Sequence, residues 1–149
     1  MQIDMTRYTA MRPYFNVIRD ALTGLVDGDD FFDYFADDAS IEFVITVPDY
    51  PRTVTGPEQL ADLYADYGQA IVQNDSSNMH RYYDPDKSTV IIEYTIHGTL
   101  VATSRPYSNR FVSVITIGNG KITHWRDYLD PLAVIAAFTE TSAPGTRGQ

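Results

Sequence analysis

The chain has 149 residues, of which 44% are hydrophobic and 13% aromatic, and its formal net charge is −9. This length fits one domain with a single core. The negative charge argues against nucleic acid and an anionic membrane as partners, because both attract positive protein surfaces. The lack of cysteine excludes disulfides, thiolate metal sites and a cysteine nucleophile. With no signal peptide and no apolar stretch long enough for a bilayer, we expect a cytoplasmic protein.

The first third of the chain predicts two helices and a strand. Apolar residues recur at three- and four-residue steps, which is typical of an amphipathic helix, here at residues 9–26. Gly28 ends this helix, and a short aromatic helix follows at residues 31–35. Residues 36–40 are predicted to form a turn, and residues 41–47 the first strand.

The middle of the chain predicts one more helix and then only strands. Gly56-Pro57-Glu58 opens the helix, since proline at the first position and an acid in the first turn both favour a helix start. The expected buried stripe of this helix consists of Leu60, Leu63, Tyr64, Tyr67 and Ile71. A polar loop is expected at residues 74–78. The following strands are predicted at residues 79–83, 89–103, 107–117 and 121–128. The longest of them should be bent or broken near Gly98.

The end of the chain predicts a hairpin and a closing helix. Asn119-Gly120 supplies the residues that a tight turn needs. Asp130 caps a helix that includes residues 133–138, so residues 1–138 form one domain, and residues 139–149 are predicted to be a flexible tail. Helices followed by a meander predict an α+β fold, in which a strongly curved sheet wraps around the N-terminal helices as a cone-shaped barrel. The mouth of such a cone is a natural pocket for a small molecule.

Asp127 is the most informative residue of the last strand. Strand alternation places it on the same face as Thr123 and Trp125. A carboxylate on the face of a tryptophan points toward an apolar interior, where burial raises its pKa and suits it to act as an acid or base. A structural interpretation is equally open, in which Asp127 caps the strand end or pairs with an arginine.

Two further polar residues are predicted to share this interior face. The Asn109 amide and the Tyr94 hydroxyl could each donate a hydrogen bond to a substrate oxygen. One base with one or two donors suffices for enolisation next to a carbonyl. The competing interpretations are a paired structural amide and a core aromatic. The predicted catalytic residues are Asp127, Asn109 and Tyr94.

The rest of the predicted chamber is apolar. Its substrate-binding residues are expected to be Phe15, Phe31, Tyr34, Ile41, Phe43, Ile96, Phe111 and Trp125. His80 could reach the mouth of the cone, whereas His97 and His124 should face outward. No histidine–carboxylate set has a spacing typical of metal ligands, so we expect no metal. Acid/base chemistry of this kind needs no organic cofactor, so we expect none.

Three segments near the C-terminus carry a resemblance to a known family. They are residues 109–115 (NRFVSVI), 119–122 (NGKI) and 125–128 (WRDY). They resemble the end of SnoaL-like proteins, in the nuclear-transport-factor-2-like superfamily. That superfamily also holds ketosteroid isomerases, polyketide cyclases, limonene epoxide hydrolases and the phenazine A/B proteins. The resemblance implies the cone fold and a homodimer across the outer face of the sheet.

The resemblance also implies roles for particular residues. In SnoaL cyclases an aspartate near the position of Asp127 is the main acid/base, and the phenazine A/B proteins carry a glutamate there. In limonene epoxide hydrolases the matching aspartate activates water. Their supporting Arg and Asp fall here at Tyr94 and Ile96, and their Tyr and Asn fall at Ile41 and Phe43. Most of the epoxide-opening set is therefore absent.

The leading functional hypothesis is a SnoaL-like enzyme of isomerase, cyclase or lyase type. It would perform cofactor-free acid/base chemistry, namely isomerisation, cyclisation or elimination, on a small hydrophobic carbonyl-bearing metabolite in an enclosed pocket. One alternative is a non-catalytic module for small-ligand binding or dimerisation. The other alternative is an epoxide hydrolase.

Overall fold

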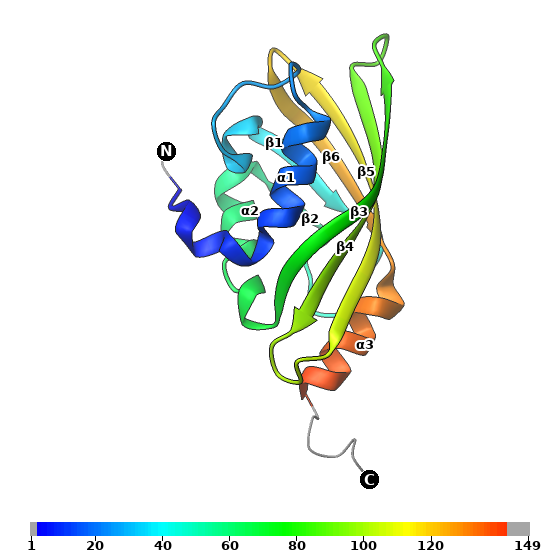
Figure 1. Cartoon of the computed structure of the whole chain (residues 1–149). Helices are drawn as coiled ribbons and strands as arrows, with labels where there is room; N and C mark the ends of the chain where they lie inside the picture. The colour runs from blue at the N-terminus through cyan, green and yellow to red at the C-terminus, as the bar shows by residue number, and fades with distance from the viewer. Residues whose placement is uncertain (1–2, 143–149) are drawn as a thin grey trace.

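The fold has two layers, a curved sheet and a group of helices against one of its faces (Figure 1). The computed structural model describes residues 3–142. The helical segments are the 3-10 helix η1 (Met5–Met11), α1 (Arg12–Ala21), the 3-10 helix η2 (Phe31–Tyr34), α2 (Gly56–Tyr64), the 3-10 helix η3 (Tyr67–Gln69) and α3 (Pro131–Ser142). Figure 1 shows α1 and α2 on the same face of the sheet, with α3 lying across one end. Among the residues described, no helix is long and apolar enough to cross a membrane.

Within residues 3–142, six strands form one mixed sheet in the order β2-β1-β6-β5-β4-β3. Their bounds are β1 Phe35–Phe43, β2 Thr53–Thr55, β3 Ile71–Asp84, β4 Thr89–Leu100, β5 Pro106–Gly118 and β6 Lys121–Leu129. All neighbours are antiparallel except β1 and β6, whose parallel register sets Phe43 beside Asp127. The sheet is curved but not closed, because β2 and β3 remain as its edges. The α+β class and the curved sheet around N-terminal helices are thereby confirmed.

Aromatic side chains fill the space between the helices and one end of the sheet. Phe15 of α1 stacks on Phe31 with ring centroids 4.4 Å apart, and Phe32 packs edge-on against both. Ile18 and Leu22 are fully buried beneath them. This packing anchors α1 on the sheet through apolar burial, worth about 1.5–3 kcal/mol for each large side chain.

The first helix is shorter than the prediction of residues 9–26. α1 ends at Ala21, and Gly24 follows with a φ of 84°. A residue with this left-handed conformation ends a helix. The apolar residues after Gly24, which extended the predicted helix, follow the turn and do not belong to α1. At the other end the chain begins with the 3-10 helix η1.

The predicted turn at residues 36–40 is wrong, because these residues form the first half of β1. Two adjacent aspartates in this segment suggested a turn. They lie instead at a register shift between Phe35 and Ser40, where the pairing with β6 is irregular. Ala39 is fully buried, whereas Asp37 and Asp38 face solvent. β1 then ends at Phe43, four residues before the predicted end of the strand.

The predicted polar loop at residues 74–78 is also wrong, since it lies within β3. Ile71 begins this strand and is not part of α2. β3 is an edge strand, whose outward residues stay in water and are therefore polar. Its two register shifts break the alternation that would have revealed it.

The strand was predicted to be bent or broken near Gly98, and the break is wrong, because β4 passes through this residue. Gly98 instead allows β3 to approach, since a Cβ atom there would lie 2.7 Å from the carbonyl oxygen of Val72. β4 ends at Leu100, before the predicted limit of residue 103. The predicted cap of the closing helix is confirmed, because Asp130 Oδ1 accepts a hydrogen bond from the Leu132 N–H at 3.0 Å. α3 runs to Ser142, and the rest of the predicted tail, 143–149, lies outside the described residues.

Candidate active site

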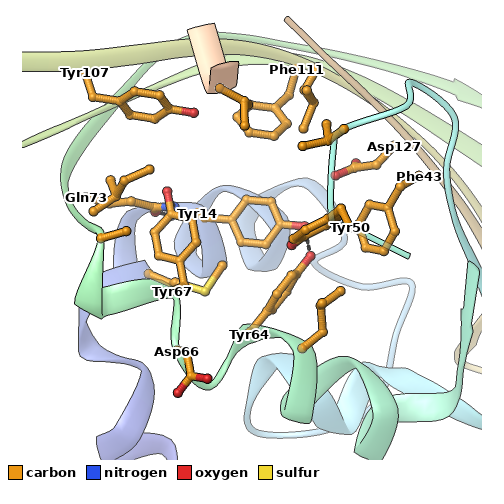
Figure 2. A pocket seen from close by; sticks show the side chains of 17 residues that line it. Tyr14, Phe43, Tyr50, Tyr64, Asp66, Tyr67, Gln73, Tyr107, Phe111 and Asp127 are labelled. Atoms are coloured by element: carbon orange, nitrogen blue, oxygen red, sulfur yellow. Dashed lines mark hydrogen bonds between the residues drawn. The ribbon is translucent and has the colours of Figure 1, made fainter. Parts of the chain in front are cut away.

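A cavity of about 250 Å³ lies between the inner face of the sheet, α1, α2 and α3. Its wall is mainly apolar and rich in aromatic residues, with five tyrosines and two phenylalanines (Figure 2). These aromatic residues are Tyr14, Phe43, Tyr50, Tyr64, Tyr67, Tyr107 and Phe111. The other polar residues of the wall are Asp66, Gln73 and Asp127. The aliphatic residues are Met11, Val47, Leu63, Ala70, Ile71, Leu129 and Val134. A small concave site with an apolar wall and few polar groups is typical of a ligand pocket.

Asp127 of β6 lines this cavity and is only 4% exposed. Its Oδ1 accepts two hydrogen bonds, from Ser113 Oγ at 2.6 Å and from Trp125 Nε1 at 2.7 Å. Burial raises the pKa of Asp127 to about 6, and the two hydrogen bonds oppose that shift. In the part of the chain that the structure describes, Oδ2 has no hydrogen-bond donor. One oxygen is thus anchored, and the other is available to a ligand.

Ser113 of β5 links Asp127 to Tyr94. Its hydroxyl donates its one proton to Asp127, so its oxygen accepts from the Tyr94 hydroxyl at 2.9 Å. Tyr94 is 2% exposed, and its ring stacks on Phe111 with centroids 5.2 Å apart. The structure therefore directs the Tyr94 hydroxyl to Ser113, not to the main cavity.

Asn109 lies outside the wall of the cavity and is 2% exposed. Its Oδ1 accepts a hydrogen bond from the Asp130 N–H at 2.9 Å, and its Nδ2 donates to the Tyr107 hydroxyl at 2.9 Å. A second, longer bond of 3.3 Å runs from Nδ2 to the carbonyl oxygen of Asp130. These bonds join β5 to the start of α3 and hold Tyr107 at the cavity.

The hydroxyls beside Asp127 come from tyrosines that the sequence did not single out for the site. Figure 2 shows the hydroxyls of Tyr14, Tyr50 and Tyr64 close together, on the side to which the Asp127 carboxylate points. Those of Tyr14 and Tyr64 are 3.4 Å apart. Burial, and then nearby groups including the charge of Asp127, raise the pKa of each, so all three stay protonated and are hydrogen-bond donors.

The sequence contains few features that would predict these tyrosines as site residues. Tyr14 lies one position away from the stripe that identifies the first helix, and Tyr50 belongs to a loop. Tyr64 was expected only as part of a buried helical stripe. Ser113 is an ordinary strand residue in the sequence. Its register partner on β6 is Asp127, which is what gives it a place in the site.

The predicted substrate-binding residues fall into three groups. Phe43 and Phe111 line the cavity. The core contains Ile41, Ile96 and Trp125, all at most 2% exposed, as well as Phe15, Phe31 and Tyr34, which border a separate surface hollow near the first helix. His80 pairs in register with Glu93 on the outer face, in a shallow hollow that Arg110 also borders.

The described residues include no group of three or more His, Asp or Glu side chains placed to hold a metal ion. A cofactor-free site remains a prediction.

A family model for the SnoaL-like domain matches residues 19–125. The chain is also 31% identical over 102 residues to the protein YesE of Bacillus subtilis strain 168. That match covers 68% of this chain and 69% of YesE. The chain belongs to the SnoaL-like family.

Solved structures share the fold at lower identity. A Bacillus subtilis protein named provisionally as an isomerase has a TM-score of 0.70 and 24% identity, covering 92% of this chain and 96% of that one. A Xanthomonas campestris protein, named provisionally as a polyketide cyclase, has a TM-score of 0.63 and 15% identity over 89% and 96%. An NTF2-like protein of Burkholderia xenovorans has a TM-score of 0.61 and 19% identity over 92% and 98%. The fold is NTF2-like.

Proposed function

We propose that this SnoaL-like protein is a cofactor-free enzyme that moves a proton on a small hydrophobic molecule bearing a carbonyl group. The observation that carries the proposal is the Asp127 carboxylate, which is buried in an aromatic cavity with one oxygen anchored and the other unpaired among the described residues. Isomerisation, cyclisation and elimination all begin with such a proton transfer.

The step we propose uses the ionised form of Asp127. With a pKa of about 6 the carboxylate is mostly ionised at neutral pH, yet it is more basic than an exposed aspartate. Oδ2 takes a proton from the carbon next to the carbonyl, and the electron pair of that C–H bond moves to the carbonyl oxygen as an enolate. Where a C=C bond is conjugated with the enolate, Asp127 returns the proton to the far carbon of that system, which is isomerisation. In cyclisation the enolate carbon adds to a second carbonyl carbon of the same molecule, the C=O π bond opens to an alkoxide, and Asp127 gives its proton to that oxygen.

The tyrosine hydroxyls supply stabilisation for the enolate oxygen. Tyr14 and Tyr64 are neutral hydroxyls held in place by the core. One of them donates to the other, which leaves one proton of the pair for the enolate oxygen, and a preorganised donor in a dry site strengthens as charge develops. Tyr50 adds a third hydroxyl on the same side of the cavity. A carbonyl oxygen placed among them would leave its neighbouring carbon near Asp127.

Deuterium exchange at the carbon next to a ketone tests this step without knowledge of the natural substrate. We expect the protein to accelerate exchange of the C2 protons of 1-tetralone in D₂O, followed by NMR. In Asp127→Asn the amide oxygen still accepts from Ser113 and Trp125, but no base remains, so exchange should fall by about 10²–10⁴-fold. Asp62→Asn, on the exposed side of α2, is the control. Equal exchange by Asp127→Asn and the unmodified protein would refute the proposal.

A second candidate is a binding module without catalysis. It is favoured by the wall of the cavity, where most polar groups are neutral hydroxyls and amides that suit retention of a ligand as well as its reaction. Tight binding of 1-tetralone with no exchange across pH 5–9 would support it. We do not propose epoxide hydrolysis, because the described residues place no arginine in the wall of the cavity.

A further inference from the structure

Two tyrosine hydroxyls lie in the cavity away from Asp127. Figure 2 shows Tyr67 and Tyr107, together with Gln73, on the opposite side of Tyr14 from the Asp127 carboxylate. Tyr67 comes from the 3-10 helix after α2, and Tyr107 comes from the start of β5. The mechanism above uses neither of them.

The direction of the hydrogen bond to Tyr67 is fixed by the backbone. Gln73 is 7% exposed, and its Oε1 accepts from the Tyr14 N–H at 3.0 Å. A backbone N–H is always a donor, so this bond identifies the oxygen of the amide. The Gln73 Nε2 must therefore be the donor in its 3.1 Å contact with the Tyr67 hydroxyl.

A backbone N–H also fixes the direction of the hydrogen bond to Tyr107. The Asp130 N–H donates to Asn109 Oδ1, which identifies Nδ2 as the donor to the Tyr107 hydroxyl at 2.9 Å. Both tyrosine oxygens thus accept from buried amides. Each hydroxyl keeps its own proton, and in the described structure neither proton is donated to another protein group.

The charges around the cavity determine which kind of ligand atom can accept hydrogen bonds from the Tyr67 and Tyr107 hydroxyls. Among residues 3–142, no lysine, arginine or histidine lines the wall, and the exposed Asp66 carboxylate borders it. Burial of an anion without a cationic partner is costly. A neutral oxygen acceptor, such as a ketone, ester or ether, carries no such cost.

We propose that Tyr67 and Tyr107 form a second subsite that donates hydrogen bonds to a neutral oxygen of the ligand. The natural ligand is then an uncharged molecule with two oxygen functions, one at the Asp127 end and one at the Tyr67–Tyr107 end. The assignment of the reacting end rests on the proposed function. Gln73 and Asn109 are positioning residues, which act through the two tyrosines.

Binding of a matched pair of ketones tests the subsite. Calorimetry would compare 1-tetralone with 6-methoxy-1-tetralone, which adds one neutral acceptor on the far side of the molecule. We expect the methoxy ketone to bind about 3–10-fold more tightly to the unmodified protein, as one or two added hydrogen bonds allow. In the double variant Tyr67→Phe/Tyr107→Phe this preference should fall below about twofold. The 6-carboxylate analogue should bind most weakly of the three.

Tyr8→Phe is the matched control. Its hydroxyl is also buried, but it donates to the Ala61 carbonyl outside the cavity, so its loss should leave the preference unchanged. If the double variant does not fold, the two single variants replace it, with thermal unfolding as the check. An unchanged preference in the tyrosine variants, a carboxylate that binds best, or no binding of the methoxy ketone at millimolar concentration would each overturn the subsite.

The two proposals fail in different ways. Loss of the binding preference with intact deuterium exchange removes the subsite alone. A retained preference without exchange removes the proposed catalysis alone.

Discussion

The Asp127 carboxylate combines two features that oppose each other. Burial favours its neutral form, whereas hydrogen bonds from Ser113 and Trp125 favour the ionised form. Burial has the larger effect, so the pKa rises from 3.8 to about 6. A buried carboxylate that ionises near neutral pH is unfavourable for the folded state and useful to a catalyst.

This balance predicts a pH-dependent stability difference between Asp127→Asn and the unmodified protein. Because the pKa is higher in the folded than in the unfolded state, Asp127 stabilises the fold below about pH 4, and this contribution is lost as pH rises through about 6. Asparagine does not titrate. The free energy of unfolding of Asp127→Asn, relative to that of the unmodified protein, should therefore increase by about 1–3 kcal/mol between pH 3.5 and 7.5. Urea unfolding at both pH values measures it, with Asp62→Asn as the control, and a constant or shrinking difference would contradict the account.

Ser113→Ala should move the pKa of Asp127 further upward. The serine hydroxyl lowers that pKa, and its removal leaves the carboxylate with the Trp125 donor alone among the described residues. The pH at which exchange activity rises should therefore increase. Stability should also fall by about 1–3 kcal/mol, since the buried Tyr94 hydroxyl loses its partner.

The pH profile separates this effect from a general loss of packing. Ser108→Ala, on the outward-facing side of the same strand, removes a hydroxyl that contacts His97. This variant should not change the pH dependence of deuterium exchange. A profile for Ser113→Ala that matches the unmodified protein would show that Ser113 does not tune Asp127.

The elements show where sequence reasoning succeeds. Apolar periodicity, Asn119-Gly120 and strand alternation predicted α1, the final hairpin and the burial of Asp127. They could not predict Ser113 as its partner. Counting back from a two-residue turn pairs Val112 with Asp127, but a register shift after Thr116 places Ser113 there instead. Bulges depend on how the sheet curves over the core, which local sequence does not encode.

Gly98 allows β3 to lie close to β4, so its replacement should be costly. A Cβ atom at Gly98 would lie 2.7 Å from the Val72 carbonyl oxygen, which is backbone and cannot rotate away. Gly98→Ala should lower the free energy of unfolding by about 1–3 kcal/mol, as measured by urea unfolding. Gly118→Ala is the control, since its nearest atom is the Thr123 side-chain methyl at 3.3 Å. Equal stability of both variants would contradict the role of Gly98.

At the scale of the whole molecule, the sheet has an inner and an outer face with different surroundings. The helices cover the inner face, and the cavity lies between them and the sheet. The outer face carries apolar side chains, among them the register partners Tyr82, 55% exposed, and Ile91, 37% exposed. The homodimer across this face remains a prediction, and exposed apolar surface is consistent with it.

Ultracentrifugation tests the dimer. We expect a mass of about twice 16.8 kDa for the unmodified protein. Ile91→Asp should shift the equilibrium toward the monomer, because it places a charge on the outer face. Val101→Asp, at an exposed site in the turn after β4, should not. A monomeric unmodified protein at micromolar concentration would contradict the prediction.

The central claim is that the buried Asp127 carboxylate is a base in the cavity, and its own titration tests that claim most directly. The measurement is the ¹³C chemical shift of the aspartate carboxyl groups as a function of pH, with the Asp127→Asn spectrum to assign the signal. We expect Asp127 to titrate near pH 6, well above an ordinary aspartate. A midpoint near 3.8 would show a solvated carboxylate and contradict the proposed chemistry.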